Sequence, residues 1–336
     1  MSKITRRTAS SLLLGAASLP LATPAVRAQG LTKINAGMLP IVNGPVYIAI
    51  KEKYFEKLGL ELNLVRFQSG PAQFAALAGG QIDLAWGGMG AFSLARANGQ
   101  DLNFFSIFMD YNPLQALVVP KGSQVKSVKD LAGKKIATAQ GSDGHYGTLR
   151  TLQKHGVDPK SAQLLFMAPP QQIAALEKGD VDAMYVWEPF VTPLLEKGGT
   201  AISWMTELDP GASFLGWAGK RAWLDANADV AARILKGWDM GLKKMKEDPE
   251  YAVKLTLEQT GMAESQARAI VKGLVHFPST AAIDPASPAY YTKGSKLNKI
   301  LTDFQAFGQE VGIIKAATNV DDFVMPRIMQ MVKDGK

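Results

Sequence analysis

Two stretches of the sequence repeat one pattern, AALAGGQIDLAW at residues 75–86 and AALEKGDVDAMY at residues 174–185. Five of the twelve positions are identical, and they include a glycine and an aspartate at matching offsets. Each copy has the pattern of a short apolar helix that ends at a glycine, followed by an aliphatic strand, because glycine adopts the left-handed C-cap conformation at low cost. The repeat therefore predicts one helix–strand unit used in two places in the fold.

Strand and helix patterns alternate on both sides of the repeat. Residues 60–67 have the period of a strand, whereas residues 45–58 and 146–155 have the spacing of helices. Strands separated by helices of this length imply mainly parallel sheets that are covered on both faces. The predicted fold class is α/β with two lobes, each a mainly parallel sheet flanked by helices. After about Gly219 the strand pattern ends, and residues 221–246 are predicted to be helical.

The chain is expected to cross twice between the lobes. Proline and glycine follow predicted strand ends at Val119-Pro120-Lys121-Gly122 and at Asp209-Pro210-Gly211, and we expect the hinge at these two places. The predicted organisation is a cleavable signal peptide over residues 1–28, the first part of lobe 1 over 29–119, lobe 2 over 120–210, and a return to lobe 1 with C-terminal helices over 211–336.

The first 28 residues have the pattern of an export signal. Lys3, Arg6 and Arg7 precede a short apolar run, and Val26-Arg27-Ala28 places small residues at the −3 and −1 positions before Gln29. A membrane-spanning helix needs about twenty apolar residues, and this run is shorter and contains two prolines. We expect cleavage and a periplasmic location, reached by either the Sec or the twin-arginine route.

Composition and charge exclude several kinds of partner and site. Four of the 37 basic residues and none of the 30 acids lie in residues 1–28, so the remainder carries 33 basic and 30 acidic residues, a net charge of +3. No nucleic-acid partner is expected at this charge, since no basic run with interleaved aromatics is present. The chain has no cysteine, which excludes disulfides, thiolate metal sites and cysteine nucleophiles. The three histidines do not have metal-ligand spacing, and neither a metal nor a cofactor is predicted.

The loops that follow the predicted strands carry the candidate binding residues. In open α/β sheets ligands bind beyond the carboxyl ends of the strands, where helix N-termini present unpaired N–H groups. One loop rich in Gly, Ser and Asn is common in any strand-to-helix turn, but five such loops occur here in both lobes. The candidate ligand-binding residues are Met38, Leu39, Asn43, Ser69, Gly70, Gln73, Gly87, Gly88, Met89, Ser142, Asp143, Gly144, His145, Tyr146, Trp187 and Glu188.

Catalysis is not predicted at these loops. Ser142, Asp143 and His145 lie close together in the sequence, but the members of a catalytic triad converge from separate elements, and no Gly-x-Ser-x-Gly elbow is present. We interpret Ser142 and Asp143 as N-cap residues of the following helix. His145 is interpreted as a first-turn donor to the ligand or as a hydrogen-bonded surface histidine.

Several motifs together resemble the periplasmic binding proteins of ABC importers for aliphatic sulfonates, taurine and nitrate, a family related to binders of thiamine pyrimidine precursors. The resemblance covers roughly residues 33–220 and lies in IAIKEKYFEKLGLEL, AALAGGQIDLAWGG, VKSVKDLAGKKIA, GSDGHY and EKGDVDAMYVWEPF. It implies a monomer with two lobes that close on a small solute and deliver it to an ABC permease in the inner membrane. It places one copy of the repeat on either side of the cleft.

The resemblance leaves the ligand open. In that family, small oxyanions are held largely by helix N-terminal N–H groups and neutral donors. The candidate loops contain no Lys or Arg, and their charged residues are Asp143 and Glu188, which would repel an anion if they faced it. Glu188 is alternatively placed at a helix N-terminus. The predicted ligand is a small organic anion such as an aliphatic sulfonate or taurine, with nitrate, an aromatic acid or a pyrimidine-type heterocycle as alternatives.

Two other functional classes compete with the importer component. The resemblance extends to thiamine-pyrimidine-synthase-like enzymes, which carry a cysteine-rich stretch, so the absence of cysteine disfavours that branch. A solute sensor that feeds a receptor has the same sequence features as an importer component. The prediction is therefore a binding protein without catalytic residues.

Overall fold

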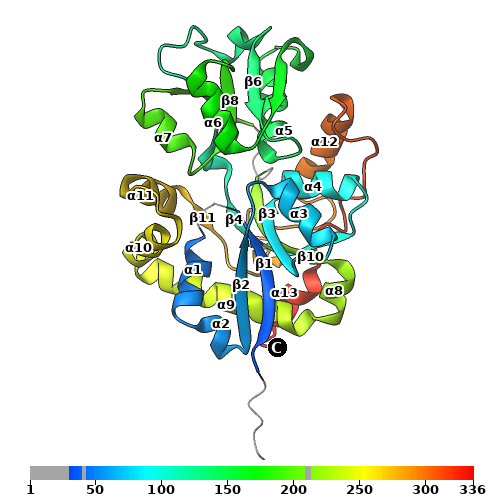
Figure 1. Cartoon of the computed structure of the whole chain (residues 1–336). Helices are drawn as coiled ribbons and strands as arrows, with labels where there is room; N and C mark the ends of the chain where they lie inside the picture. The colour runs from blue at the N-terminus through cyan, green and yellow to red at the C-terminus, as the bar shows by residue number, and fades with distance from the viewer. Residues whose placement is uncertain (1–29, 40–42, 209–212) are drawn as a thin grey trace, which may run out of the picture. The chain divides into compact units, whose positions relative to one another are not determined.

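The computed structural model describes residues 30–39, 43–208 and 213–336 (Figure 1). The predicted signal peptide at residues 1–28 and the predicted crossing at residues 209–211 lie outside them. Contacts group Leu31–Lys336 into one unit that contains both sheets. Within the described ranges, no helix combines the length and apolar character needed to cross a membrane.

The first sheet has six strands in the order β11-β4-β10-β3-β1-β2. Its strands are β1 (Thr32–Met38), β2 (Leu60–Arg66), β3 (Leu84–Gly88), β4 (Leu102–Asp110), β10 (Phe214–Lys220) and β11 (Val275–His276). β1 pairs in parallel with β2 and β3, whereas β10 is antiparallel to both of its neighbours, β3 and β4. The second sheet has five strands in the order β7-β6-β8-β5-β9. Its strands are β5 (Gln115–Val119), β6 (Lys135–Thr138), β7 (Gln163–Phe166), β8 (Ala183–Trp187) and β9 (Thr200–Trp204).

Parallel pairing is confined to three neighbouring strands in each sheet, β2-β1-β3 and β7-β6-β8, although the sequence predicts mainly parallel sheets. The chain enters the second sheet through β5 and returns to the first through β10. The first residues of β5 pair with the end of β8, and the first residues of β10 pair with the end of β3. Each crossing strand therefore begins beside the carboxyl ends of the parallel strands. It has to run antiparallel to them to cross the sheet.

This arrangement bears on the predicted lobe boundary at residues 119/120. β5, which ends at Val119, belongs to the second sheet, and the chain passes between the sheets from Asp110 to Gln115. Pro120 follows the other end of β5. We therefore propose that lobe 2 begins between Asp110 and Gln115.

Helices flank both sheets. α3 and α4 contact β3 and β10, α9 contacts β2, and α13 contacts β4, while α5 and α6 contact β6 and β8 of the second sheet. The helices beside the first sheet are α1 (Gly44–Lys51), α2 (Tyr54–Lys57), α3 (Gly70–Ala78), α4 (Met89–Ala97), α8 (Arg221–Ala226), α9 (Ala228–Glu247), α10 (Pro249–Thr260), α11 (Glu264–Gly273), α12 (Lys296–Glu310) and α13 (Pro326–Lys333). Those of the second are α5 (Asp143–Lys154), α6 (Pro169–Lys178) and α7 (Val191–Glu196), and short 3₁₀ turns are η1 (Asn112–Leu114), η2 (Val128–Leu131), η3 (Pro159–Ser161), η4 (Met205–Glu207) and η5 (Ala281–Ile283).

The repeated sequence has the same structural role in each sheet. Its two glycines, Gly80 and Gly179, both have positive φ, 74° and 80°, at the ends of α3 and α6. Its two aspartates each bind the backbone of the neighbouring strand: the Oδ2 atom of Asp83 accepts from the Asn35 N–H group, and that of Asp182 accepts from the Lys135 N–H group, both at 2.8 Å. The repeat therefore anchors a helix–strand unit to the neighbouring strand of the sheet, once in each lobe.

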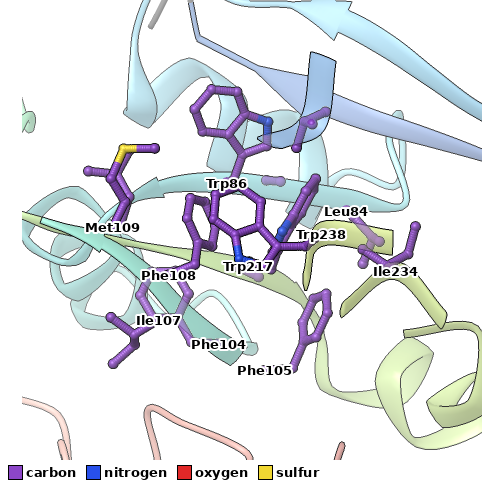
Figure 2. Close-up of a cluster of buried hydrophobic side chains, with 14 of the residues drawn as sticks. Leu84, Trp86, Phe104, Phe105, Ile107, Phe108, Met109, Trp217, Ile234 and Trp238 are labelled. Carbon is purple, nitrogen blue, oxygen red and sulfur yellow. The ribbon is translucent and has the colours of Figure 1, made fainter. Parts of the chain in front are cut away.

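Aromatic side chains fill the core of the first lobe (Figure 2). Trp86 on β3 and Trp217 on β10 face each other across the strand pair with ring centroids 6.5 Å apart, and the ring of Phe108 lies 4.4 Å from that of Trp238 on α9. All four side chains are completely buried. Because Trp86 is part of this core, it does not add an aromatic surface to a ligand site.

Candidate functional site

A small cavity lies where the two lobes meet. Its volume is about 30 Å³, which is room for one or two water molecules. It is lined by Leu39, Gly70, Gly88, Ala91, Tyr111, Gln115, Ser142, Asp143, Trp187 and Leu215. These residues come from the carboxyl ends of strands in both sheets, from the start of α3, α4 and α5, and from the two crossing strands. Six of the sixteen predicted ligand-binding residues are among them.

Asp143 connects the two lobes at this cavity. It is the first residue of α5 in the second lobe, and its Oδ1 atom accepts a hydrogen bond of 2.9 Å from the Ala91 N–H group in the first turn of α4. A Cβ atom at Gly88 would lie 1.8 Å from Asp143 Oδ2, and one at Gly90 would lie 2.5 Å from Oδ1. Only glycine at these two positions lets the carboxyl group approach the backbone of α4 so closely.

The surroundings of Asp143 have opposite effects on its pKa. Burial raises the pKa of Asp143 to about 6, and hydrogen bonds from the Ala91 N–H group, the Ser213 hydroxyl and the Gly90 N–H group oppose this shift. The N-terminus of α4 favours a negative charge because its N–H groups point toward it. No lysine or arginine lines the cavity. The carboxylate thus takes the place that a small anion occupies at a helix N-terminus, without a counterion.

Two polar atoms at the cavity have no hydrogen-bond partner among the described residues. Trp187 is 4% exposed and its Nε1–H group is unpaired, and Gln115 is 1% exposed with an unpaired Oε1 atom. An unpaired polar atom in a buried position is costly, and such atoms at a cavity wall indicate a polar ligand. The amide of Gln115 can present either its oxygen or its NH₂ group to that ligand.

Glu188 is engaged within its own lobe. Its carboxylate accepts from the Thr192 N–H group at 3.1 Å and from the Thr192 hydroxyl at 2.5 Å, at the start of α7. Its backbone carbonyl accepts a 2.6 Å hydrogen bond from the Tyr111 hydroxyl. Burial raises the pKa of Glu188, and the bonds from Thr192 oppose that shift. The interpretation of Glu188 as a helix N-terminal residue is therefore confirmed, and Glu188 does not line the cavity.

The other residues of the GSDGHY segment differ in role. Ser142 is the N-cap of α5, as predicted, since its Oγ atom accepts from the His145 N–H group at 3.3 Å. The prediction that Asp143 caps the same helix is wrong, because the N–H groups of α4 bind its carboxylate instead. Gly144 packs close to the backbone of β8, where a Cβ atom would lie 3.2 Å from the Tyr185 carbonyl oxygen.

His145 and Tyr146 are buried and do not line the cavity. The His145 Nδ1 atom accepts from the Gly141 N–H group at 3.2 Å, and its ring packs edge-on against Phe166. It is 4% exposed, so the interpretation as a surface histidine is wrong, whereas its role as a donor to a ligand stays a prediction. The Tyr146 ring lies 4.3 Å from that of Phe304 on α12. Tyr146 thus belongs to an apolar contact between α5 and the first lobe.

The remaining candidates in the first lobe do not line the cavity: Met38, Asn43, Ser69, Gln73, Gly87 and Met89. Both methionines are buried in the core. The Asn43 Oδ1 atom accepts from the Val46 N–H group and so caps α1, and the Gln73 Nε2 atom donates to the Trp86 carbonyl at 2.7 Å. These polar side chains support the turns that carry the cavity wall.

Sequence reasoning missed four residues of the cavity wall. Ala91 follows the predicted residues Gly87, Gly88 and Met89, and Leu215 lies on the crossing strand β10. Tyr111 and Gln115 are the two with polar side chains. Both lie at the passage between the sheets, Tyr111 after β4 and Gln115 as the first residue of β5. The available signal was a glutamine at the head of the otherwise apolar stretch QALVV, since a polar residue in such a strand requires a partner.

A larger groove of about 1020 Å³ lies beside α5 and includes His145, Phe166 and the segment Glu310–Ile313. Its walls are mostly helix flanks and loops rather than strand ends. We assign the functional site to the smaller cavity because the strand ends, the N-terminus of α4 and the unpaired polar atoms meet there. Among the described residues, no group of three or more His, Asp or Glu side chains is arranged to hold a metal ion.

Residues 42–252 match the family described as NMT1/THI5 like. The chain belongs to the NMT1/THI5-like family. A taurine-binding periplasmic protein of Escherichia coli (strain K12) is 28% identical to this chain over 304 residues, which cover 85% of this chain and 89% of that protein.

Solved structures show the same fold. The alkanesulfonate-binding protein SsuA from Xanthomonas axonopodis pv. citri, bound to MOPS, is 20% identical and aligns with a TM-score of 0.76 over 89% of this chain and 99% of that one. The desulfurization enzyme DSZB aligns with a TM-score of 0.65 at 15% identity, over 90% of this chain and 99% of that one. The chain therefore has the two-lobed fold of periplasmic binding proteins, a fold that also supports an enzyme.

Proposed function

We propose that this protein is the solute-binding component of an ABC importer, and that it captures a small organic sulfonate in the periplasm and passes it to an inner-membrane permease. The observation that carries the proposal is the buried cavity between the lobes, with the N–H groups of α4, the Trp187 indole and the Gln115 amide at its wall. A sulfonate has three acceptor oxygens, and helix N-terminal N–H groups bind such anions without a countercharge. The taurine-binding and alkanesulfonate-binding relatives support the same ligand class.

A binding role is favoured over catalysis by the arrangement of the reactive side chains. The Ser142 Oγ atom donates to the Ala139 carbonyl at 2.7 Å and accepts from the His145 backbone, so His145 is not placed as a base for Ser142. The His145 Nδ1 atom is bonded to the Gly141 N–H group. A nucleophile and its base need a direct hydrogen bond between their side chains, which this pair lacks. We therefore propose a binding protein rather than an enzyme, and its monomeric state stays a prediction from the sequence.

Calorimetric titration tests the proposal with a pair of tryptophan variants. The mature protein should bind ethanesulfonate, taurine or isethionate and gain about 2.7 kcal/mol of stability at a hundredfold excess over Kd. Trp187→Phe removes the unpaired indole N–H group at the cavity, and the loss of a hydrogen bond to a charged group should weaken binding by roughly 10-fold to 100-fold. Trp217→Phe removes a second unpaired, buried indole N–H group that lies in the core, and it should leave the affinity unchanged.

The proposal would be overturned if the folded protein bound none of these sulfonates, or if both tryptophan variants had the same effect on Kd. Nitrate, benzoate and a pyrimidine in the same titration cover the other ligand classes that the sequence left open.

A further inference from the structure

The carboxylate of Asp143 and the acid group of a solute require the same N–H groups. Asp143 is bound in the first turn of α4, at Ala91 and beside Gly88 and Gly90. The cavity around it holds about 30 Å³, which is too small for any organic sulfonate. A solute can therefore reach the N-terminus of α4 only if the Asp143 carboxylate moves away from it.

A displaced Asp143 needs a new partner. It is buried, no lysine or arginine lines the cavity, and the polar groups nearby belong to the neutral side chains Trp187, Gln115 and Ser213. A simple organic anion would bring a second negative charge next to Asp143 in a poorly solvated space, which is costly. An ammonium group on the solute would instead supply the missing positive charge.

We propose that Asp143 is a specificity-determining residue that selects organic anions carrying an amino group. The acid group of the solute replaces the Asp143 carboxylate at the α4 N–H groups, and the ammonium group pairs with Asp143. This inference rests on the proposed function of the cavity as a sulfonate site, and it narrows that function to aminosulfonates.

The buried charge of Asp143 is consistent with this role. Its pKa of about 6 indicates that its present donors do not fully compensate its burial, and a nearby ammonium group would lower that pKa. The titratable neighbours are Tyr111 and Tyr185, both with pKa values raised by burial, and His145, whose pKa is lowered by burial to about 4. All three are neutral near pH 6, so they do not supply a countercharge.

The test compares taurine with isethionate, which have the same sulfonate and chain length and differ by an ammonium and a hydroxyl group. The wild-type protein should bind taurine at least tenfold more tightly. In Asp143→Asn this ratio should fall to near one, mainly through weaker taurine binding, whereas Asp180→Asn, which removes an exposed carboxylate from the same lobe, should keep the wild-type ratio. Asp143→Ser serves as a second variant if the asparagine variant does not fold.

A second measurement needs only the wild-type protein. Titrations near pH 6 in buffers of different ionisation enthalpy should show proton release when taurine binds and proton uptake when isethionate binds, because the two solutes shift the pKa of Asp143 in opposite directions. The inference is overturned if isethionate binds as tightly as taurine, if Asp143→Asn keeps the ratio, or if both solutes show the same proton linkage. In those cases sulfonate binding itself still stands. Absence of binding for every sulfonate overturns the proposed function and this inference together.

Discussion

Alanine at Gly88 should break the contact that Asp143 makes between the lobes. Gly88 has φ of −70° and ψ of 146°, which alanine adopts without strain, so the replacement acts through its added methyl group alone. That methyl group would lie 1.8 Å from Asp143 Oδ2 and 2.6 Å from its Cγ atom. Non-bonded carbon and oxygen atoms need about 3 Å or more, so the carboxylate has to move by more than about an ångström.

The magnitude follows from the hydrogen bond that is lost. A shift of this size stretches the 2.9 Å bond from the Ala91 N–H group beyond hydrogen-bond range. A hydrogen bond to a charged group contributes about 1.5 to 3 kcal/mol, and the buried N–H group is left unpaired. We expect Gly88→Ala to lower the free energy of unfolding by about 2 to 3 kcal/mol.

A double-mutant cycle with Asp143→Ala isolates this contact. In the Asp143→Ala background there is no carboxylate to displace, so Gly88→Ala should cost less than about 0.5 kcal/mol in urea unfolding. Gly219→Ala, whose methyl group would meet the Leu224 side chain at 2.9 Å and shares no partner with Asp143, provides a control that should be additive with Asp143→Ala. Additivity of Gly88→Ala and Asp143→Ala within about 0.5 kcal/mol would refute the proposed contact.

Two further predictions concern other buried groups. Burial lowers the pKa of His145 to about 4, below the usual value of about 6.5, so the unfolded chain takes up the proton first as the pH falls. Protonation of His145 should remove up to about 3 kcal/mol of stability between about pH 6.5 and pH 4, so His145→Gln should lose less stability than the wild type over this range in urea titrations; equal losses contradict it. His276, whose pKa burial lowers to about 3, and Asp143, whose pKa burial raises to about 6, act with opposite signs and are present in both proteins. Gly241→Ala would place a methyl group 2.0 Å from the Pro45 carbonyl oxygen and should cost about 3 kcal/mol in the same assay. Gly273→Ala, which meets only the end of Leu114, should change stability by less than about 1 kcal/mol, and equal costs for the two glycine variants would contradict the packing argument.

The repeated helix–strand unit was predictable from the sequence because its signals are local. Helix periodicity and a terminal glycine act within a few residues, and α3 and α6 end as the pattern predicts. The function of the repeated aspartate was not predictable in this way. Asp83 and Asp182 bind strands that lie 48 and 47 residues away, a pairing that appears only once the sheet is assembled.

The crossing strands β5 and β10, and the strand β4 before the first crossing, were harder to predict than the repeat. β4 and β5 are buried along nearly their whole length, so their sequences do not alternate between apolar and polar residues. The antiparallel insertion of β10 depends on its pairing with β3, far away in the sequence. Two predicted long helices are also divided in the structure, at Lys53 with φ of 58° and at Asn227, where tertiary packing overrides the continuous helical pattern.

The candidate site also contains one contact that depends on local sequence and one that depends on the tertiary structure. Ser142 was correctly predicted as an N-cap, because a cap is a contact between residues three apart. Asp143 is one residue further on, and its sequence context equally suits a cap. Whether its carboxylate binds its own helix or another depends on the position of α4, which is fixed by the other lobe. Sequence alone therefore identifies the loop and leaves the partner of its acid undetermined.

In the proposed function, the first turn of α5 contacts both the ligand and the first lobe. Asp143 reaches the N-terminus of α4, and three residues later Tyr146 packs against Phe304 on α12, so both contacts change if α5 moves relative to the first lobe. A solute that only displaced Asp143 would remove a stabilising contact and oppose closure of the lobes. A solute that also binds the α4 N–H groups and pairs with Asp143 restores the contact and keeps the apolar packing of Tyr146. Since a ligand shifts a conformational equilibrium only by its difference in affinity for the two states, such a solute should favour the closed arrangement most strongly.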